Sequence, residues 1–432
     1  MALPTNVLQQ VQTYQRSELA YLLNSFASLN LANKKFKDFE NREANLGDTV
    51  TFDLPPQSIA QNGLVVTFGA AVQRVQSLTA SQSANVPFAF SAQQFIFNVK
   101  QYMEEFGKSS IYTLGTAIES DVNLNFISGV VNQNTTALNT SSGPYRFYAS
   151  VNAGSLQPIN SYGQLAQALA NFRDYGSATM DTRAIVPMTA VPGIINSGLN
   201  QFATTRNNED AMSWMLGDFD KCDWYQSNLL PIQNAGTVGN SAQVLTLVST
   251  NDPTGQNITQ LVFSGATAND PNAIKAGDLL QFNDGVVGFA NMRYNVFIGN
   301  RPSSQPVQFR ATSNVTATAG GQVTINIFPA LISAPILGQN LNQPLAAGMQ
   351  ASAMPSHRAG IIFSGNALFL AMPQLPEEIP FPTANAVDKA SGASIRSYYG
   401  SLFGQNQRGY VHDAIWGSTL VPEYSMRLCF PV

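Results

Sequence analysis

The sequence predicts an α+β protein in which a body of mixed structure is interrupted by an antiparallel β domain. Helical spacing of apolar residues dominates residues 1–235, apart from one strand-like stretch near residue 50. Between residues 236 and 330 this spacing disappears, and short apolar runs alternate with clusters of Gly, Asn, Asp and Pro. Residues 331–432 return to a mixed pattern. We therefore expect an inserted β domain, built as an antiparallel sandwich or barrel.

The N-terminal segment is predicted to be helical as far as about Glu40. Apolar residues between Val7 and Phe26 recur at steps of three and four residues, which places them on one helix face. A basic cluster follows, formed by Lys34, Lys35 and Lys37. This cluster is either a solvated helix end or a contact to nucleic acid or to an acidic neighbour.

A long β-hairpin is predicted next. Apolar and polar residues alternate over Thr49–Leu54, as in a half-buried strand, and Pro55 follows directly. A second extended run covers Leu64–Phe68 and continues less regularly to Leu78, with a polar tip between the two runs. Because an isolated two-stranded ribbon is marginal in water, this hairpin is expected to lie on a protein surface, such as that of another subunit.

Two capping boxes mark helix starts, because their hydroxyl and amide groups satisfy backbone donors that helix ends leave unbonded. Ser91 with Gln94 opens a long helix that we expect to run to about Val130. Its apolar stripe consists of Phe95, Val99, Tyr102, Met103, Phe106, Leu114, Ala117, Ile118 and Val122. Ser161 with Gln164 opens a shorter helix, and a third, weaker helix is predicted over 209–216.

Short strands fill the predicted insertion. They cover residues 244–248, 261–263, 279–282, 286–287, 296–298, 307–311 and 323–328. In the chain that follows, residues 361–363 are predicted to form a buried strand and residues 366–371 a short helix. Residues 395–399 and 424–430 are predicted to be closing strands.

The chain is unusually poor in charge. Charged residues make up 11% of its 432 residues, against about 25% in ordinary soluble domains, and the net charge is −4. These values exclude highly charged disorder and a dedicated nucleic-acid binder. Two cysteines cannot build a disulfide framework, no apolar run is long enough for a membrane helix, and we expect no secretory signal. Because charge is depleted at interface cores, we expect a protein packed against copies of itself.

No catalytic residue, cofactor or metal site is predicted. His357 and His412 stand outside any zinc or triad motif, and the pair His412–Asp413 is either an oriented base or a structural pair. The acidic residues between Asp218 and Asp223 resemble half of a calcium loop. They lack the glycine and the later bidentate glutamate that such a loop needs, so a turn is the preferred interpretation.

Four groups of residues carry a resemblance to a known family. They are Gly47–Val50 at the start of the hairpin, Val86–Ser91 before the long helix, Phe219–Pro231 before the insertion, and the strand-opening motif Lys275-Ala276-Gly277-Asp278 within it. In this order of elements the chain resembles the major capsid (coat) proteins of tailed bacteriophages, which have the Hong Kong 97-type fold. It is most similar to the podovirus coat-protein branch, which carries an inserted β-barrel.

The resemblance implies a domain organisation. Its segments would be an N-terminal arm (1–45), an extension loop (46–90), a peripheral domain with the spine helix (91–160), the first part of an axial domain (161–235), the inserted antiparallel β-barrel (236–330), the second part of the axial domain (331–410) and a closing peripheral strand (411–432).

The resemblance also implies a function and partners. The protein would assemble with copies of itself, as hexamers and pentamers, into an icosahedral head shell in the host bacterial cytoplasm, and would end in the virion capsid. A scaffolding protein, a portal protein and a decoration or cement protein would be partners, packaged double-stranded DNA would be contacted weakly, and no membrane would be involved. Because charge is scarce, the charged residues of the arm and loop are the predicted intersubunit contacts: Lys34, Lys35, Lys37, Asp53 and Arg74.

Two alternatives remain open at this point. One is a carbohydrate-binding or adhesive β-rich protein of a virion or cell surface, with the insertion as its binding module. The other is an enzyme of unknown type, whose turnover would depend on His412 or Asp220.

Overall fold

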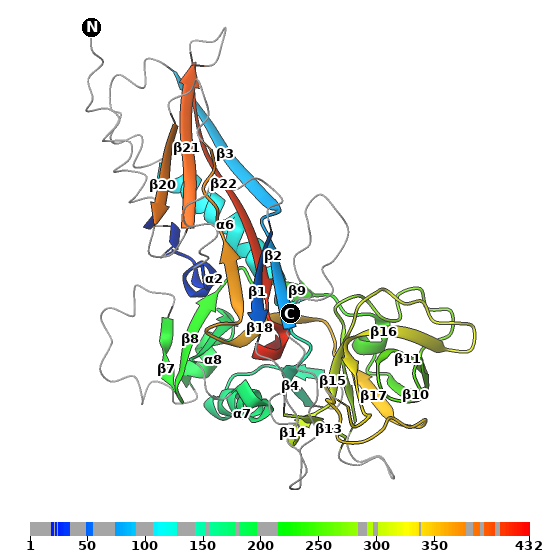
Figure 1. Ribbon diagram of the computed structural model, residues 1–432. Helices are drawn as coiled ribbons and strands as arrows, with labels where there is room; N and C mark the ends of the chain where they lie inside the picture. The colour runs from blue at the N-terminus through cyan, green and yellow to red at the C-terminus, as the bar shows by residue number, and fades with distance from the viewer. Residues whose placement is uncertain are drawn as a thin grey trace, which may run out of the picture.

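The described residues of the computed structural model form an α+β fold with a lower body, an elongated arm above it and a barrel at its side (Figure 1). These residues are 19–20, 22–23, 25–34, 49–54, 74–91, 107–127, 143–152, 155–177, 181–196, 215–283, 292–296, 301–336, 338–376, 383–388, 393–401 and 407–432. Within them, no helix has the length and apolar character needed to cross a membrane.

The lower body is built on a mixed eight-stranded sheet. Its strands follow the order β5 (Ser155–Gln157), β4 (Phe147–Asn152), β23 (Ser425–Phe430), β18 (His357–Ser364), β6 (Thr182–Pro187), β8 (Cys222–Ser227) and β7 (Met215–Phe219), with β9 (Ile232–Gln233) paired to β18. On one face lie α7 (Tyr162–Phe172), the π-helical turn η2 (Arg173–Ser177) and α8 (Val191–Asn196). Leu165 and Phe172 of α7 share a buried core there with Trp224 of β8.

The arm is an antiparallel sheet with a helix along it. The strand order is β19 (Leu368–Ala371), β22 (Gln407–Leu420), β21 (Ala393–Ser401) and β20 (Thr383–Asp388), and β3 (Gln82–Ser91) also pairs with β22. Helix α6 (Lys108–Leu124) packs along β3 and β22 (Figure 1). Leu114, Ile118 and Val122 of α6 are fully buried, which confirms this part of the predicted apolar stripe.

The base of the predicted hairpin is confirmed. Strands β1 (Thr49–Leu54) and β2 (Arg74–Thr79) pair antiparallel, with Thr49 opposite Thr79. Val50 and Leu78 are buried against Ala371, so this part of the ribbon lies on the arm of its own subunit. The rest of the hairpin, residues 55–73, lies outside the described residues.

The inserted domain is a closed six-stranded barrel. Around it run β10 (Val244–Thr250), β11 (Ile258–Ser264), β16 (Gln322–Leu331), β15 (Gln308–Ala311), β12 (Leu279–Phe282) and β17 (Gln350–Ala353), which returns to β10. Phe263, Phe282 and Phe309 pack at its centre with ring centroids 5.3 to 6.4 Å apart. A short hairpin, β13 (Arg293–Asn295) with β14 (Pro302–Pro306), lies beside the barrel.

The barrel extends past residue 330, the predicted end of the insertion. Strand β17 pairs with both β10 and β12, so the barrel closes only with the chain as far as Ala353. The sequence hides this strand because Gln350-Ala351-Ser352-Ala353 carries no large or β-branched residue. Of the strand predicted at 296–298, only Val296 is described, and it lies just after β13, which ends at Asn295. Residues 297–298 and 286–287 lie outside the described residues.

Two predicted helices are wrong in the described part of the chain. Residues 215 and 216, the end of the helix predicted over 209–216, belong to strand β7. Residues 368–371 form strand β19 after a turn, where a helix over 366–371 was predicted. In β19 the neighbouring Leu368 and Leu370 are buried and Phe369 lies against Phe52 of the ribbon. A short apolar run of this kind does not distinguish helix from strand without its tertiary neighbours.

One predicted helix start is confirmed and two predicted helix ends are wrong. The N-terminal helix stops at Leu31, not near Glu40, because Asn33 forms a bridge with Phe369, and α6 stops at Leu124, not near Val130. The capping box of Ser161 and Gln164 is present: the Gln164 amide donates to Ser161 Oγ, and the Gln164 side chain accepts from the Ser161 amide. In the N-terminal segment the regular helix is α2 (Ala27–Leu31), preceded by helical residues from Leu19. Ser91 is the last residue of β3, and its predicted cap on the long helix lies outside the described residues, as do residues 92–106.

Candidate functional site

The residues predicted to make intersubunit contacts are only partly within the described chain. Asp53 lies on the exposed face of β1. Lys34, just after α2, is 8% exposed, so its own subunit covers most of the side chain. Arg74 is the first residue of β2, and its side chain is outside the description. Lys35 and Lys37 lie outside the described residues. Of the five, only Asp53 and Lys34 have side chains within the described part of the chain, and the intersubunit role stays a prediction.

The described polar side chains converge instead at two junctions inside the subunit. The first, which we name the spine junction, is the row Glu119, Asp121, Asn123 and Asn125 on α6 and the loop after it. All four side chains are buried. Residues two apart on a helix point to nearly opposite sides, whereas residues four apart share a side. The row therefore divides into two pairs.

Glu119 and Asn123 hold α2 and the end of β8. The carboxylate of Glu119 accepts hydrogen bonds from the amides of Ser28 and Leu29, at 3.3 and 3.2 Å, and from Ser227 Oγ at 3.2 Å. Asn123 accepts from Ser28 Oγ and donates to the Leu229 carbonyl at 3.0 Å. One turn of α6 thus joins the N-terminal segment to the body sheet.

Asp121 and Asn125 hold the opposite partner, β22. Asp121 Oδ2 accepts from the indole Nε1 of Trp416 at 2.8 Å, and Asn125 Nδ2 donates to Ser418 Oγ at 2.7 Å. Burial raises the pKa of Asp121 to about 6, and the bond from Trp416 lowers it only in part. Burial also raises the pKa of Glu119, against the lowering effect of its hydrogen bonds.

The second site, which we name the barrel junction, begins at the predicted motif Lys275–Asp278. Asp278 Oδ1 accepts from Gln233 Nε2 at 3.0 Å, and Oδ2 accepts from the amides of Gly236 and Lys275 at 2.9 and 2.8 Å. Gly277 has φ +89°, a left-handed conformation that glycine adopts without a Cβ clash. The motif therefore forms a tight turn that ties the incoming chain to the barrel.

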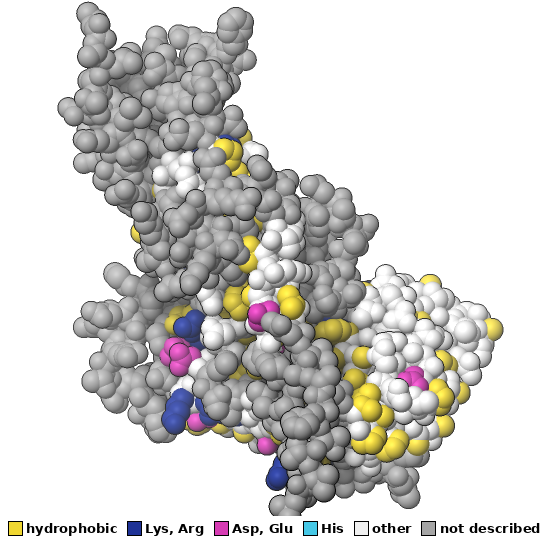
Figure 2. Space-filling model, in the orientation of Figure 1, with side chains coloured by type: hydrophobic (Ala, Val, Ile, Leu, Met, Phe, Trp, Pro, Cys, Tyr) yellow, Lys and Arg dark blue, Asp and Glu magenta, His cyan; other side chains and the backbone are white. Residues whose placement is uncertain are grey.

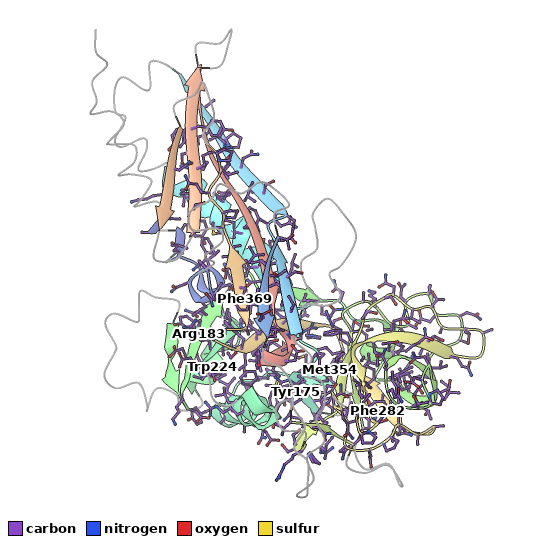
Figure 3. All side chains as sticks on the ribbon, viewed as in Figure 1. Tyr175, Arg183, Trp224, Phe282, Met354 and Phe369 are labelled. Atoms are coloured by element: carbon purple, nitrogen blue, oxygen red, sulfur yellow. The ribbon has the colours of Figure 1, made fainter. Side chains whose placement is uncertain are left out.

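The far side of the barrel junction is aromatic and amide-rich. Gln308 of β15 exchanges two hydrogen bonds with the backbone of Phe147, at 2.8 and 3.0 Å. Tyr175 of η2 shares a hydroxyl hydrogen bond with Tyr145 at 2.8 Å and packs edge-on against Tyr294, with centroids 5.8 Å apart. Figure 3 labels Tyr175 and Met354 where the body meets the barrel. These contacts make the barrel a fixed extension of the body.

Two buried arginines complete this junction. Arg427 of β23 donates to the Gly277 carbonyl, to the Ile127 carbonyl and to His357 Nε2. Arg146 donates to the carbonyls of Glu423 and Ser425, and its guanidinium lies 4.1 Å from the ring centroid of Tyr175. Burial lowers the pKa of both arginines and lowers that of His357 to about 3. Both arginines act as multiple donors to backbone carbonyls.

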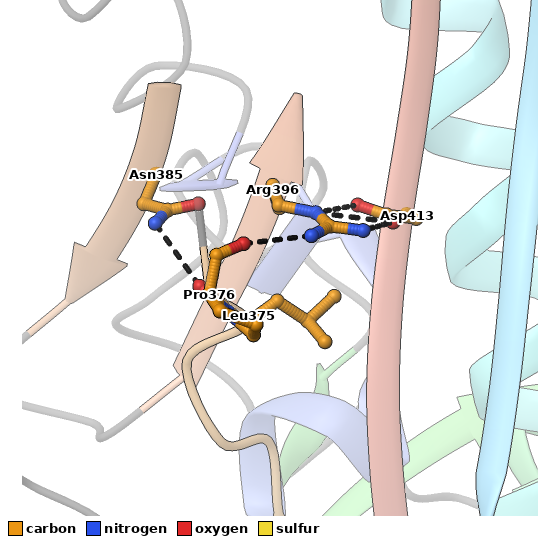
Figure 4. Close-up of polar contacts among 5 residues, drawn as sticks. All are labelled: Leu375, Pro376, Asn385, Arg396 and Asp413. Atoms are coloured by element: carbon orange, nitrogen blue, oxygen red, sulfur yellow. Dashed lines mark hydrogen bonds and ion pairs between the residues drawn. The ribbon is translucent and has the colours of Figure 1, made fainter. Parts of the chain in front are cut away.

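The three residues considered for catalysis, His412, Asp413 and Asp220, each bond to another side chain of the fold. His412 is buried, bonded to Ser397 Oγ at 2.8 Å, and burial lowers its pKa to about 3. Asp413 instead pairs with Arg396, which also donates to the Pro376 carbonyl (Figure 4). Asp220 pairs with Arg173 at 3.0 Å. Across the described part of the chain, no three His, Cys, Asp or Glu side chains are placed to hold a metal ion.

Sequence reasoning missed the spine junction. Glu119, Asp121, Asn123 and Asn125 match no motif, and their spacing by two divides them between nearly opposite sides of a helix. Their partners come from residues 28, 29, 227, 229, 416 and 418, which no local pattern connects to α6. The usable signal is Trp416, because a buried indole requires an acceptor for its N–H.

No protein-family model matches the chain, and a search of curated proteins finds no match. Among solved structures, the chain is similar to one titled "Mycobacterium phage Che8", with a TM-score of 0.42 and 8% identity over 93% of this chain and 90% of that chain. For "Capsid of Ralstonia phage GP4" the TM-score is 0.39 and the identity 9%, over 93% and 88%. For "Capsid structure of the Cyanophage P-SCSP1u" they are 0.38 and 10%, over 92% and 88%. At these values the likeness assigns neither a fold family nor a function.

Proposed function

We propose that this chain is the major capsid protein of a tailed bacteriophage, with a Hong Kong 97-type fold and an inserted barrel. In this function it assembles with copies of itself into the icosahedral shell that encloses a double-stranded DNA genome. It acts as a structural protein rather than as an enzyme, and its place is the virion capsid after assembly in the cytoplasm of the host bacterium.

One observation carries the proposal: the order of elements along the chain. An N-terminal helix, a β-ribbon, a long helix beside an extended sheet, and a body interrupted by a closed barrel follow one another as the family resemblance predicts. The barrel enters after β9 and leaves before β18, two strands that pair with each other in the body sheet. It is therefore a true insertion into one continuous sheet.

The composition supports the same function. A shell subunit covers much of its surface with neighbours, and interface cores are depleted of charge. The chain has 11% charged residues, and among the described residues several of these are buried at the two junctions. A net charge of −4 gives no attraction to a polyanion, which suits weak contact with packaged DNA.

The proposed partners follow from assembly. The copies form hexamers and pentamers, a scaffolding protein guides their closure, a portal protein occupies one vertex, and a decoration or cement protein binds the outside. Asp53 on the exposed face of β1, with Arg74, Lys34, Lys35 and Lys37, is proposed to contact neighbouring subunits.

The test is the state of the purified chain, expressed alone and together with scaffolding candidates from a phage genome. Closed shells or rings of five and six subunits in negative-stain microscopy are the expected result. A stable monomer or trimer that forms no shell under either condition, and that is retained on a glycan column, would refute the proposal and favour an adhesive protein.

A further inference from the structure

Titratable groups gather inside the barrel junction although the visible surface of the barrel has few charged side chains. In Figure 2 almost no Lys, Arg, Asp or Glu side chain is seen on the barrel, which lies at the lower right. Within the junction, Asp278, Arg310, His357 and Arg427 are each at most 1% exposed. A buried charge is costly unless it is hydrogen-bonded, so the partners of these groups define what the junction holds together.

The guanidinium of Arg427 donates to three segments that are far apart in the sequence. Nη2 donates to the Ile127 carbonyl, and Nη1 lies 3.4 Å from both the Gly277 carbonyl and Nε2 of His357. Arg427 itself belongs to β23, inside the body sheet between β4 and β18. Because the guanidinium is planar and rigid, its two terminal nitrogens cannot move apart to follow separate partners.

The two carbonyls are fixed to different elements by backbone hydrogen bonds. Ile127 continues the end of α6, because its amide donates to the Leu124 carbonyl at 3.1 Å. Gly277 is fixed to the barrel, because its amide donates to the Ala311 carbonyl of β15 at 2.9 Å. A displacement of either carbonyl is therefore a displacement of the element to which it belongs.

His357 supplies the third acceptor as a neutral ring. Its Nδ1 lies 2.8 Å from the Pro355 carbonyl, on the chain that leaves the barrel, and therefore carries the proton. This leaves Nε2 as the acceptor for Arg427. Burial, followed by the charge of Arg427, lowers the pKa of His357 to about 3, so the ring keeps this acceptor at neutral pH.

A shared donor of this kind opposes independent movement of the elements that it joins. If the end of α6 shifts away from the barrel, Arg427 can follow only one of the two carbonyls. The N–H group that loses its carbonyl stays buried, and leaving a buried donor unbonded is unfavourable. A shift in which α6 and the barrel move together keeps both bonds.

We propose that Arg427 is a coupling residue, which makes the end of α6 and the inserted barrel open and move as one unit. Asp278 already fastens the barrel to the chain that enters it, through Gln233 and Gly236. Arg427 adds a link from the same turn of the barrel to α6. The coupling is a property of a single chain, so it goes beyond the proposed function and does not depend on shell formation.

The experiment measures amide hydrogen exchange of the full, unassembled chain in increasing urea, below the unfolding transition. Two segments are followed: residues 122–127 at the end of α6 and residues 275–279 in the barrel turn. In the unaltered chain their protection factors should agree within about threefold and fall with the same urea slope, because coupled segments open together. In Arg427→Met, which removes the donors but keeps an apolar side chain, the two protection factors should differ by more than about tenfold.

Arg146→Met is the matched control. Arg146 is also fully buried beside the junction, but its hydrogen bonds reach the carbonyls of Glu423 and Ser425 within the body. Its loss should lower protection without separating the two segments. The coupling is refuted if Arg427→Met gives the same result as Arg146→Met. Different urea slopes for the two segments in the unaltered chain would also refute it, and this measurement requires no variant to fold. Shell formation is scored separately, so its failure would leave the coupling standing.

Discussion

Replacing Asp121 by asparagine should change how the free energy of unfolding depends on pH. Asp121 lies on α6 with 2% of its surface exposed, and Trp416 is the donor to one of its oxygens. The other oxygen, Oδ1, is buried without a hydrogen-bond partner among the described residues. An asparagine can still accept the bond from Trp416, but it carries no charge at any pH.

The magnitude follows from the pKa of Asp121, which folding raises from 3.8 to about 6. A carboxyl whose pKa rises on folding stabilises the native state when it is protonated, and this stabilisation is lost as the pH rises through the folded value. Between about pH 4.5 and about pH 7.5 this single group should lower the free energy of unfolding by about 2 kcal/mol. Glu119 and Asp278, whose pKa values burial also raises, act in the same direction.

The assay is urea denaturation of the unassembled chain at both pH values, followed by tryptophan fluorescence. The quantity of interest is the difference between the unaltered chain and Asp121→Asn, because the other titrating groups cancel in it. This difference should shift by about 2 kcal/mol between the two pH values. Ser120→Ala changes an exposed neighbour on the same helix and should keep the pH response of the unaltered chain. An Asp121→Asn chain with the full pH response would show that this carboxyl does not titrate in a buried site.

Two further predictions concern the junctions, and a third concerns the packing of α6. Glu119→Ala removes the acceptor of three hydrogen bonds and should lower the free energy of unfolding by about 2–4 kcal/mol. Amide exchange over α2 should be faster in this variant than in Glu119→Gln. Equal exchange in the two variants would contradict this role. Asp278→Ala removes the acceptor of three hydrogen bonds at the barrel junction and should lower the free energy of unfolding by about 2–4 kcal/mol. The measurements are the urea midpoint and amide hydrogen exchange at residues 236 and 275. An unchanged midpoint would contradict the prediction. Gly115→Ala places a Cβ 2.2 Å from the Phe26 ring and should destabilise the chain. Gly163→Ala in α7 meets open space and should be neutral or stabilising by up to about 1 kcal/mol. Equal unfolding temperatures for the two variants would contradict this difference.

Much of the fold could be predicted because its strands and caps have local signatures. Alternation over Thr49–Leu54 reflects a ribbon with one face on the arm, and the Ser161 capping box is satisfied within three residues. The barrel strands that carry large apolar residues were likewise recognisable. The strands that were not predicted depend on residues far away in the sequence. Strand β19 is a short apolar run whose state is decided by β22 and by Phe52, and β17 has only small side chains although it closes the barrel.

The candidate site was harder to predict because it consists of polar side chains that become buried only when distant segments pack together. No local pattern marks Glu119 and Asp121 as buried polar residues, and only the folded chain covers them with α2 and β22. The motif ending in Asp278 was recognised as a strand opening, but its role in joining the barrel to the body needs Gln233 and Gly236, more than forty residues away.

These burials alter the expectation that the scarce charges set the contacts between subunits. Among the described residues, eight charged side chains are buried within the subunit: Lys34, Glu119, Asp121, Arg146, Asp278, Arg310, Arg396 and Arg427. Such groups stabilise little by themselves, because desolvation offsets their hydrogen bonds, but losing one partner of a buried pair is costly. Their effect is therefore to fix how α2, α6, the body sheet and the barrel are joined. Because these charges are buried, the surface is still poorer in charge than the composition indicates. Such a surface favours contacts between subunits that depend on shape complementarity and on buried apolar area.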